Sequence, residues 1–289
     1  SNNPTTTTVF SGNICGLDIT GTTLMCNNAV DPDPQSYGMK ILGGLTDATA
    51  TIGGNTIDKA NIFSGNDLIG IYHSASTTSY SYIGNICGLQ IDGTSMVASN
   101  PQTIGMQIEN SGSHFIGTAN GGEGNVFSGN TEIGLKITNA TATANKIYGN
   151  VIGLQKNGTT RVVSNTQNYG VHIESASNEI GSATAGEGNV ISGNLDAGIK
   201  ITGAAATGNK IYGNFIGVTD TEAGVTGSNQ DDGVLIEAAS SDNEIGLNAG
   251  EENVIAGNTS NGIRLTGANT TGNEITKNYI GIGSDQSTN

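Results

Sequence analysis

The sequence predicts an all-β protein folded as a single-stranded right-handed parallel β-helix, a solenoid with three short strands in each turn. The first observation is an internal repeat, because a six-residue word recurs at a constant step of 64 residues. Its copies NIFSGN, NVFSGN, NVISGN and NVIAGN begin at Asn61, Asn125, Asn189 and Asn253. The second is the local pattern, in which β-branched pairs alternate with Asn and Gly and so predict very short strands with forced corners.

Each 64-residue unit divides into two turns. A glycine followed by an apolar-x-apolar triplet opens each turn, and after the first the gaps alternate near 35 and 29 residues. These glycines are Gly38, Gly70, Gly105, Gly134, Gly170, Gly198, Gly233 and Gly262. The spacing predicts about eight to nine turns, grouped as a 64-residue two-turn super-repeat.

Each turn is expected to contain three strands. In two successive turns they are predicted at 198–202, 209–214 and 215–218, and then at 233–237, 243–246 and 253–258. Equivalent strands then stack at about 4.8 Å, and the crossover rule favours right-handed winding.

Alternation along the strands predicts which side chains form the core. Ile199 and Ile201 point inward, whereas Lys200 and Thr202 point outward, because side chains alternate with a period of two. Equivalent residues lie over one another in successive turns. One inward column should therefore contain Ile137, Ile201 and Leu265.

Glycine and asparagine mark the predicted corners. Glycine supplies backbone freedom, and asparagine tolerates left-handed dihedral angles. Stacked asparagine amides can also hydrogen-bond to their copies above and below. Two such ladders are predicted, one through Asn61, Asn125, Asn189 and Asn253 and one through Asn150, Asn214 and Asn278.

Surplus residues are expected in surface loops that line up in two columns. The first column comprises 17–37, 154–169 and 218–232, and the second comprises 182–188 and 247–252. A single β-helix domain is predicted over 1–289. Its repeat units run roughly over 1–60, 61–124, 125–188, 189–252 and 253–289.

Charge and composition exclude several classes of partner. The chain has 10 Lys and Arg against 25 Asp and Glu, a formal net charge of −15, which disfavours nucleic-acid binding. No apolar run reaches the length of a membrane span. Contact with cations or with a neutral glycan remains compatible with this charge.

The three cysteines match no zinc or redox motif. Cys15 and Cys87 stand in GNICGL words where other copies have Ile, so they are expected to fill the core. Whether Cys26 forms a disulfide with Cys15 stays open.

The words N-x-I-x-G-N and G-[IV]-x-[IL], as in NKIYGN and GVHIE, resemble right-handed β-helix repeats of the pectate-lyase-like superfamily. They are most similar to the carbohydrate-binding and sugar-hydrolase type repeats of secreted bacterial proteins. The resemblance covers nearly all of the chain and implies the fold. The superfamily includes lyases, glycosidases, epimerases, tailspikes, adhesins and surface-layer components, so the fold alone does not choose a function.

For a lyase, the resemblance implies calcium-binding Asp residues and an Arg or Lys base on one sheet. The outward column of the first strand does carry cations, namely Lys40, Lys136, His172, Lys200 and Arg264. The neighbouring column carries Glu109, Glu174 and Glu237, and the second strand alternates Lys146, Glu179, Lys210 and Glu244. We interpret these charges as ladders between turns. In the alternative interpretation, Lys136, His172 and Lys200 are catalytic candidates.

Asp231 and Asp232 form the best acidic pair for a glycosidase. The polygalacturonase family also carries an adjacent Asp pair, but its NTD, GHG and RIK words are missing here. Other copies of the site read QSYG, QTIG and QNYG, so a polar loop-end cap is the other interpretation. No cofactor is expected. Calcium is conceivable at loop acids such as Glu251 and Glu252, but no calcium motif supports it.

The histidines and tyrosines give weaker indications. His73 replaces an inward Ile, His114 lies at a strand start, and the three histidines fall in different turns with no triad or metal cluster apparent. The tyrosines expected to point outward are Tyr72, Tyr148 and Tyr212. They either stack on sugar rings or pack on the strand surface.

These observations favour a structural rod, the subunit of an extracellular or cell-surface filament or adhesin. The repeat runs from Val9–Leu17 to Ile280–Gly283 without a capping helix, and β-helix ends expose unpaired strand edges. Head-to-tail stacking into a filament, or truncation from a larger protein, is therefore expected. The alternatives are a polysaccharide lyase or glycoside hydrolase, which we favour less, and a glycan-binding tailspike-like module.

Overall fold

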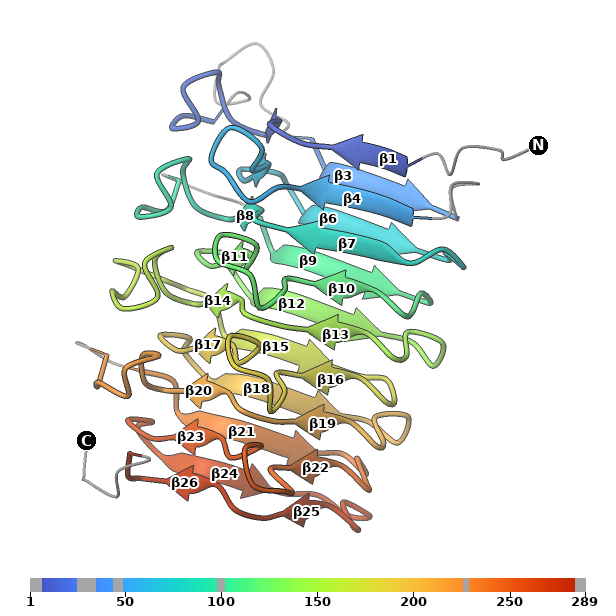
Figure 1. Ribbon diagram of the computed structural model, residues 1–289, viewed down its shortest axis with the longest axis vertical. Coiled ribbons are helices and arrows are strands. Elements are labelled where there is room, and N and C mark those ends of the chain that lie inside the picture. Colours follow the sequence, from blue (N-terminus) through green and yellow to red (C-terminus); the bar gives the residue numbers. More distant parts are fainter. Residues whose placement is uncertain (1–6, 25–34, 44–48, 98–101, 226–228, 284–289) are drawn as a thin grey trace.

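The computed structural model describes residues 7–24, 35–43, 49–97, 102–225 and 229–283. The chain winds as a right-handed parallel β-solenoid whose strands stack into three sheets (Figure 1). Neighbouring strands within each sheet are paired in parallel. The all-β fold with three short strands per turn, as predicted from the repeat, is confirmed.

Strands of the three sheets follow one another in a fixed cycle along the chain. The first sheet contains β3 (Tyr37–Leu42), β6 (Ile69–Ser74), β9 (Ile104–Glu109), β12 (Ile133–Thr138), β15 (Tyr169–Ile173), β18 (Ala197–Thr202), β21 (Asp232–Glu237) and β24 (Asn261–Leu265). The second contains β1 (Thr7–Phe10), β4 (Thr49–Gly53), β7 (Tyr80–Ile83), β10 (Phe115–Ile116), β13 (Lys146–Ile147), β16 (Glu179–Ile180), β19 (Lys210–Ile211), β22 (Glu244–Ile245) and β25 (Glu274–Ile275). The third contains β2 (Ile14–Cys15), β5 (Ile62–Phe63), β8 (Ile86–Cys87), β11 (Val126–Phe127), β14 (Val151–Ile152), β17 (Val190–Ile191), β20 (Phe215–Ile216), β23 (Val254–Ile255) and β26 (Tyr279–Ile280).

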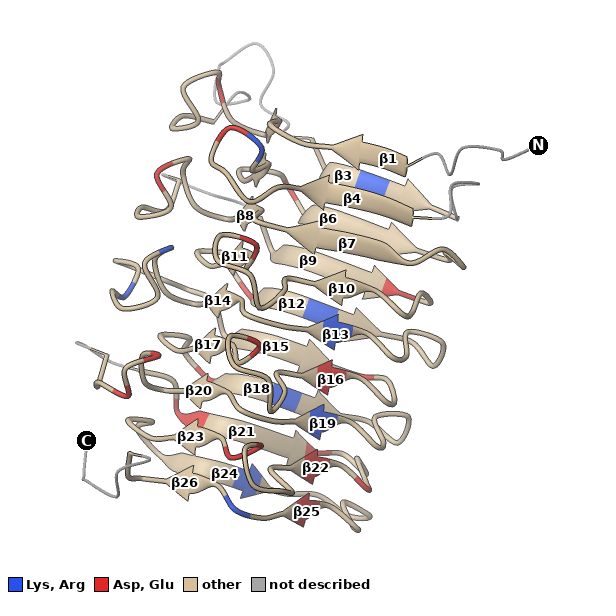
Figure 2. Cartoon of the chain, viewed as in Figure 1, with Lys and Arg blue, Asp and Glu red and all other residues tan. Residues whose placement is uncertain are grey.

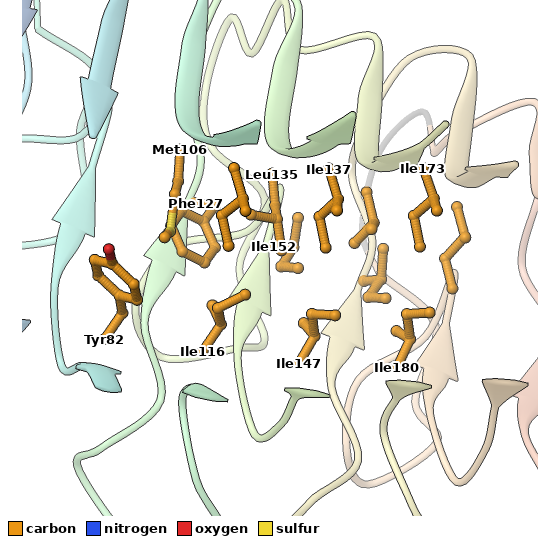
Figure 3. Close-up of a cluster of buried hydrophobic side chains, with 14 of the residues drawn as sticks. Tyr82, Met106, Ile116, Phe127, Leu135, Ile137, Ile147, Ile152, Ile173 and Ile180 are labelled. Carbon is orange, nitrogen blue, oxygen red and sulfur yellow. The ribbon is translucent and has the colours of Figure 1, made fainter. Parts of the chain in front are cut away.

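Aliphatic side chains from all three sheets meet along the axis of the solenoid. Figure 3 shows Ile137 and Ile173 of the first sheet facing Ile147 and Ile180 of the second. All four are fully buried. Burying one such side chain stabilises the fold by about 1.5–3 kcal/mol, so the core is the main source of stability.

The predicted inward column is confirmed by the strand register. Ile137 pairs with Ile173, which pairs with Ile201, and the column continues through Ile236 to Leu265. Leu265 belongs to the last strand of the first sheet and is 43% exposed, whereas the other members are fully buried. The column is therefore continuous, and only its end meets solvent in the described part of the chain.

The two predicted asparagine series form one ladder, which lies at the corner between the second and third sheets. Asn150 shows the pattern, because its backbone N–H and its Nδ2 both donate to Asn189 Oδ1, at 3.0 and 2.9 Å. Its own Oδ1 accepts the same two bonds from Asn125. We call this the first ladder, and it runs through Asn13, Asn61, Asn85, Asn125, Asn150, Asn189, Asn214, Asn253 and Asn278.

Two further amide ladders occupy the other corners, and the sequence analysis did not predict them. The second ladder joins the first and second sheets through Asn145, Asn178, Asn209, Asn243 and Asn273. The third ladder joins the third and first sheets and alternates Gln with Asn, through Gln35, Asn66, Gln102, Asn130, Gln167, Asn194 and Gln230. Stacked primary amides thus line all three corners, with the second ladder beginning at Asn145.

The role of the corner residues differs from the prediction in one respect. No ladder asparagine has a positive φ; at many ladder positions the preceding residue has it instead, as at Gly149 with φ of 64° and Ala144 with φ of 58°. The turn-opening glycines serve a different purpose, because a β-carbon on each of Gly38 to Gly233 would lie within 2.4–2.9 Å of the carbonyl oxygen of the next such glycine. Close approach of the backbones therefore requires glycine at these positions.

The surface loops form two columns, as predicted, on either side of the outer face of the third sheet. Loops of the first column begin with short antiparallel bridges, Leu17 to Leu24, Leu89 to Met96, Leu154 to Arg161 and Val218 to Gly224. Loops of the second column follow the second sheet at 54–60, 118–124, 182–188 and 247–252. Each column recurs at every second winding.

Cys87 is fully buried in the core, and Cys15 packs against the same core, as predicted for residues that replace Ile. Burial raises the pKa of both thiols. The question of a disulfide between Cys15 and Cys26 lies outside the described residues, because Cys26 is not among them.

We expect Asn150→Ala to lower the free energy of unfolding by about 2–4 kcal/mol. The substitution leaves the Asn125 side chain and the Ile116 carbonyl without their buried partner. Thr184→Ala, at an exposed loop position, is the control and should change stability by less than about 0.5 kcal/mol. Chemical denaturation compares the two, and equal stability of both variants would contradict a stabilising ladder.

Candidate functional site

The outer face of the first sheet carries the cations that the sequence analysis singled out. The strand register places Lys136, His172 and Lys200 in one column on successive windings. Figure 2 shows the Lys and Arg positions on these strands and the alternation of basic and acidic residues on the second sheet. This outer face is the surface that the lyase hypothesis would use.

Both lysines of this column form ion pairs with a glutamate one winding away. Lys136 Nζ lies 3.1 Å from Glu174 Oε1, and Lys200 Nζ lies 2.9 Å from Glu237 Oε1. Lys200 also stacks over the Tyr169 ring, with 4.7 Å between Nζ and the ring centroid. The lysine charges are therefore neutralised by neighbouring windings, as expected of inter-turn ladders.

His172 sits between these lysines and is nearly buried. Burial lowers its pKa to about 4, although Glu174 opposes this shift. The His172 Nε2 lies 3.3 Å from Glu174 Oε1, but the imidazole is neutral at pH 7, so this contact is not an ion pair at that pH. The Glu174 carboxylate is held instead by Lys136 and by the Thr138 hydroxyl, which together keep its pKa below the usual range despite burial.

The second sheet shows the same alternation of charge. Lys146, Glu179, Lys210 and Glu244 are neighbours in register, and Lys210 Nζ lies 3.9 Å from Glu244 Oε2. Tyr148 and Tyr212 donate their hydroxyls to Glu179 and Glu244 respectively.

Of the two interpretations of the outward tyrosines, packing on the strand surface fits the burial of two of them. Tyr148 and Tyr212 are each only 5% exposed, and the hydroxyl of each donates to a glutamate of the next winding. Tyr72 is half-buried and donates to Glu109 Oε2 at 2.7 Å. The tyrosines thus serve packing between windings.

The two adjacent aspartates do not converge on one point. Asp232 is 2% exposed, and its carboxylate accepts bonds from Arg264 Nε and Asn261 Nδ2, both at 2.7 Å. Asp231 is exposed and accepts a 2.7 Å bond from Thr259 Oγ1. Each carboxylate is committed to the following winding, which agrees with the polar-cap interpretation.

A buried aromatic cluster in the upper windings was missed by the sequence analysis. His73 and His114, expected in separate turns, have ring centroids 4.5 Å apart across adjacent windings, and Tyr80 and Tyr82 pack against both. The Tyr82 hydroxyl forms a short hydrogen bond with His73 Nδ1. His114 Nδ1 accepts from the Tyr80 backbone N–H, so Nε2 carries the proton toward Ser111 Oγ at 2.7 Å. Because His114 donates to the Ser111 hydroxyl in this bond, it cannot accept the serine proton and does not activate the serine as a nucleophile.

Exceptions to the repeat would have revealed this cluster. His73 stands in an inward column between Ile41 and Ile108, and His114 occupies the second-ladder position that is Asn145 in the next winding. Burial lowers the pKa of His73 to about 3 and that of His114 to about 4, so both rings are neutral at pH 7.

Among the described residues, no group of three or more His, Cys, Asp or Glu side chains is arranged to hold a metal ion. The expectations about cofactors and calcium remain predictions. Within the same part of the chain, no helix is long and apolar enough to span a bilayer.

Comparisons with protein-family models, with curated proteins and with solved structures find no match. The pectate-lyase-like superfamily therefore remains a resemblance of the repeat words. The parallel β-solenoid itself is observed directly.

We expect the pair of Lys200 and Glu237 to contribute about 0.5–1 kcal/mol, and less at 1 M salt, because both side chains are partly exposed. A double-mutant cycle with Lys200→Met and Glu237→Gln, followed by denaturation, measures this coupling. The distant pair Lys59 and Glu237 is the control and should show none. A coupling of zero for Lys200 and Glu237 at low salt would contradict the ladder.

Acid should destabilise the windings that contain His73 and His114. Because their pKa values are lower in the folded protein than in the unfolded chain, the unfolded chain binds more protons below about pH 6.5. As the pH is lowered, the free energy of unfolding therefore decreases, by up to about 1.4 kcal/mol per pH unit for each histidine, until the pH reaches the folded-state pKa.

The double variant His73→Ile with His114→Asn introduces the residue types found at the equivalent positions, Ile in the inward column and Asn in the second ladder. It should remove most of the pH dependence that these two histidines cause. Denaturation at pH 7 and pH 5 measures the effect. His172→Gln is made separately, because the pKa of His172 is also lowered. If the double variant lost as much stability at pH 5 as the natural sequence does, the buried histidines would not be the cause.

Proposed function

We propose that the protein is a structural rod of an extracellular surface, the subunit of a filament or adhesin, and that it adds further copies head to tail through its strand edges. The observation that carries the proposal is the polarity of the amide ladders. In the first ladder, every bond between two side-chain amides runs in the same direction, from a donor asparagine to the asparagine of the next C-terminal winding. The two ends of the solenoid therefore differ chemically.

The end strands carry complementary hydrogen-bonding groups. Asn278 accepts from Asn253, and its backbone N–H has no partner among the described residues. At the other end, Asn13 donates to Asn61, and its Oδ1 has no partner in the same part of the chain. Asn13 of a second copy, placed beyond Asn278, would continue the ladder in the same sense. Contact between such unlike ends is heterologous and propagates into a fibre.

Apolar side chains at the two ends would continue the core columns across such a contact. Phe10 and Cys15 lead the inward columns of the second and third sheets, and Ile275 and Ile280 end the same two columns. Ile280 is 46% exposed. Stacking of Phe10 on Ile275 and of Cys15 on Ile280 would bury these edges.

The pairing of the surface charges also supports a structural role. Lys136 and Lys200, the candidate bases of a lyase, are bound to Glu174 and Glu237 at 3.1 and 2.9 Å. Asp231 and Asp232, the candidate glycosidase acids, bond to different partners. These contacts favour the rod over a polysaccharide lyase or glycoside hydrolase.

Electron microscopy and sedimentation over a range of concentrations test the proposal. We expect filaments with an axial repeat of about 40 Å, which is the height of nine strands stacked at about 4.8 Å. Ile280→Arg should shorten or abolish them, because it places a charge in the apolar contact. Val163→Arg, at a loop residue that is 80% exposed, is the matched control and should leave assembly unchanged. Rods of one subunit at the highest concentration would contradict assembly.

A further inference from the structure

The outer face of the third sheet carries two cavities between the loop columns. The first has a volume of about 300 Å³ and lies between the second-column loops 54–60 and 118–124. The second has a volume of about 550 Å³ and extends from loop 182–188 to Gly250 and Glu252. Second-column loops project only at alternate windings, and between them Val151 and Phe215 of the intervening windings stay partly exposed.

The two cavities adjoin and share an apolar floor. Gly149, Val151 and Gly186 line both of them. The floor consists of outward side chains of the third sheet. Val151 and Phe215 are partly exposed, whereas Ile86, Val126 and Val190 lie buried beside them. Together the cavities form one groove that runs along the rod, centred on Val151.

The second-column wall of the groove is preorganised by internal hydrogen bonds. Glu123 accepts from Thr118 Oγ1 at 2.6 Å and from Asn120 Nδ2 at 2.8 Å. Glu187 and Glu251 tie the two following loops in the same way. Successive loops also lie close together, since a β-carbon on Gly186 would lie 2.9 Å from the Ala119 carbonyl oxygen. The wall does not have to order itself around a ligand.

The first-column loops form the opposite wall, and they are likewise linked. The Lys156 backbone N–H donates to the Gly93 carbonyl at 2.8 Å, and the Ile91 N–H donates to the Gly21 carbonyl at 3.1 Å. Lys156 reaches the first cavity, and Asp220 lines the second. Both sides of the groove are therefore fixed to the solenoid.

The groove repeats along the rod every two windings, or about 9.6 Å. An extended peptide repeats its side-chain directions every two residues, about 6.8 Å, and would lose register with the loops. A polyproline helix repeats at about 9.3 Å, but its binding grooves are lined by aromatic side chains. Phe215 is the one aromatic side chain in the described lining of the two cavities, whereas such grooves are built from several.

The chemistry of the lining indicates a carbohydrate without charge. Hydroxyl and amide groups, such as those of Thr56, Thr118 and Asn120, surround aliphatic residues, which suits a sugar ring with its polar edge and apolar face. Asp220 and Glu252 in the second cavity, and the net charge of −15, disfavour an anionic chain.

We propose that this groove binds a neutral glycan chain that lies parallel to the rod axis, with its sugar rings over Val151 and Phe215, the partly exposed residues of the floor. The site is separate from the outer face of the first sheet and from the end strands. It does not depend on head-to-tail assembly.

Isothermal titration with neutral gluco-, manno- and galacto-oligosaccharides of increasing length tests the proposal. Polygalacturonate and a proline-rich peptide are included as representatives of the two competing classes of ligand, anionic polysaccharides and peptides. At least one neutral series should bind, with an affinity that rises with length until the ligand spans both cavities. Binding only of polygalacturonate, only of the peptide, or of nothing in the panel would overturn the proposal.

Two substitutions at Val151 locate the site. Val151→Trp fills the groove where the cavities meet and should weaken binding at least about tenfold. Val151→Thr keeps the shape of the side chain and should retain binding within about threefold. Circular dichroism verifies that both variants are folded. A Trp variant that is folded and binds as tightly as the natural sequence would place the ligand elsewhere and refute this site.

Discussion

The structure depends on one constraint, which is that the polar groups at three buried corners must be paired from winding to winding. Among the described residues, the Asn258 amide at the corner of the third ladder is an exception. The amide side chain satisfies the constraint because it offers two donors and two acceptor lone pairs. Asn150 uses its side chain fully, with bonds to the windings on both sides and to the Ile116 carbonyl. Register and spacing both follow from keeping these amides aligned.

The interior and the exterior of the rod therefore place different requirements on the residues at their positions. Inside, a residue must match the size and polarity of its copies in other windings. The exceptions are His73, which bonds to the Tyr82 hydroxyl, and His114, which bonds to the Tyr80 backbone and to Ser111. Outside, charges face partners one winding away, as Lys136 faces Glu174. Between the loop columns, the alternation of long and short turns leaves the outer face of the third sheet partly uncovered. The two adjoining cavities lie there.

The repeat made the fold predictable, because a 64-residue period and alternating Ile residues determine both the stacking and the inward columns. The first ladder was predictable for the same reason, although its two series were not recognised as one. Gln167 and its equivalents were visible in the sequence, but the third ladder was not predicted, because its Gln and Asn members alternate and were not recognised as one column. The groove could not be predicted, because it depends on how loops distant in sequence approach one another in space.

The alternation of the third ladder limits how such a rod can change in length. A glutamine reaches across to an asparagine in each step, so Gln167 lies between Asn130 and Asn194. Loss or gain of one winding would set two long or two short side chains against each other, and would also change the two-winding spacing between loops of one column. Genetic duplication or deletion would preserve the architecture only in whole pairs of windings, so the pair is the heritable unit of length.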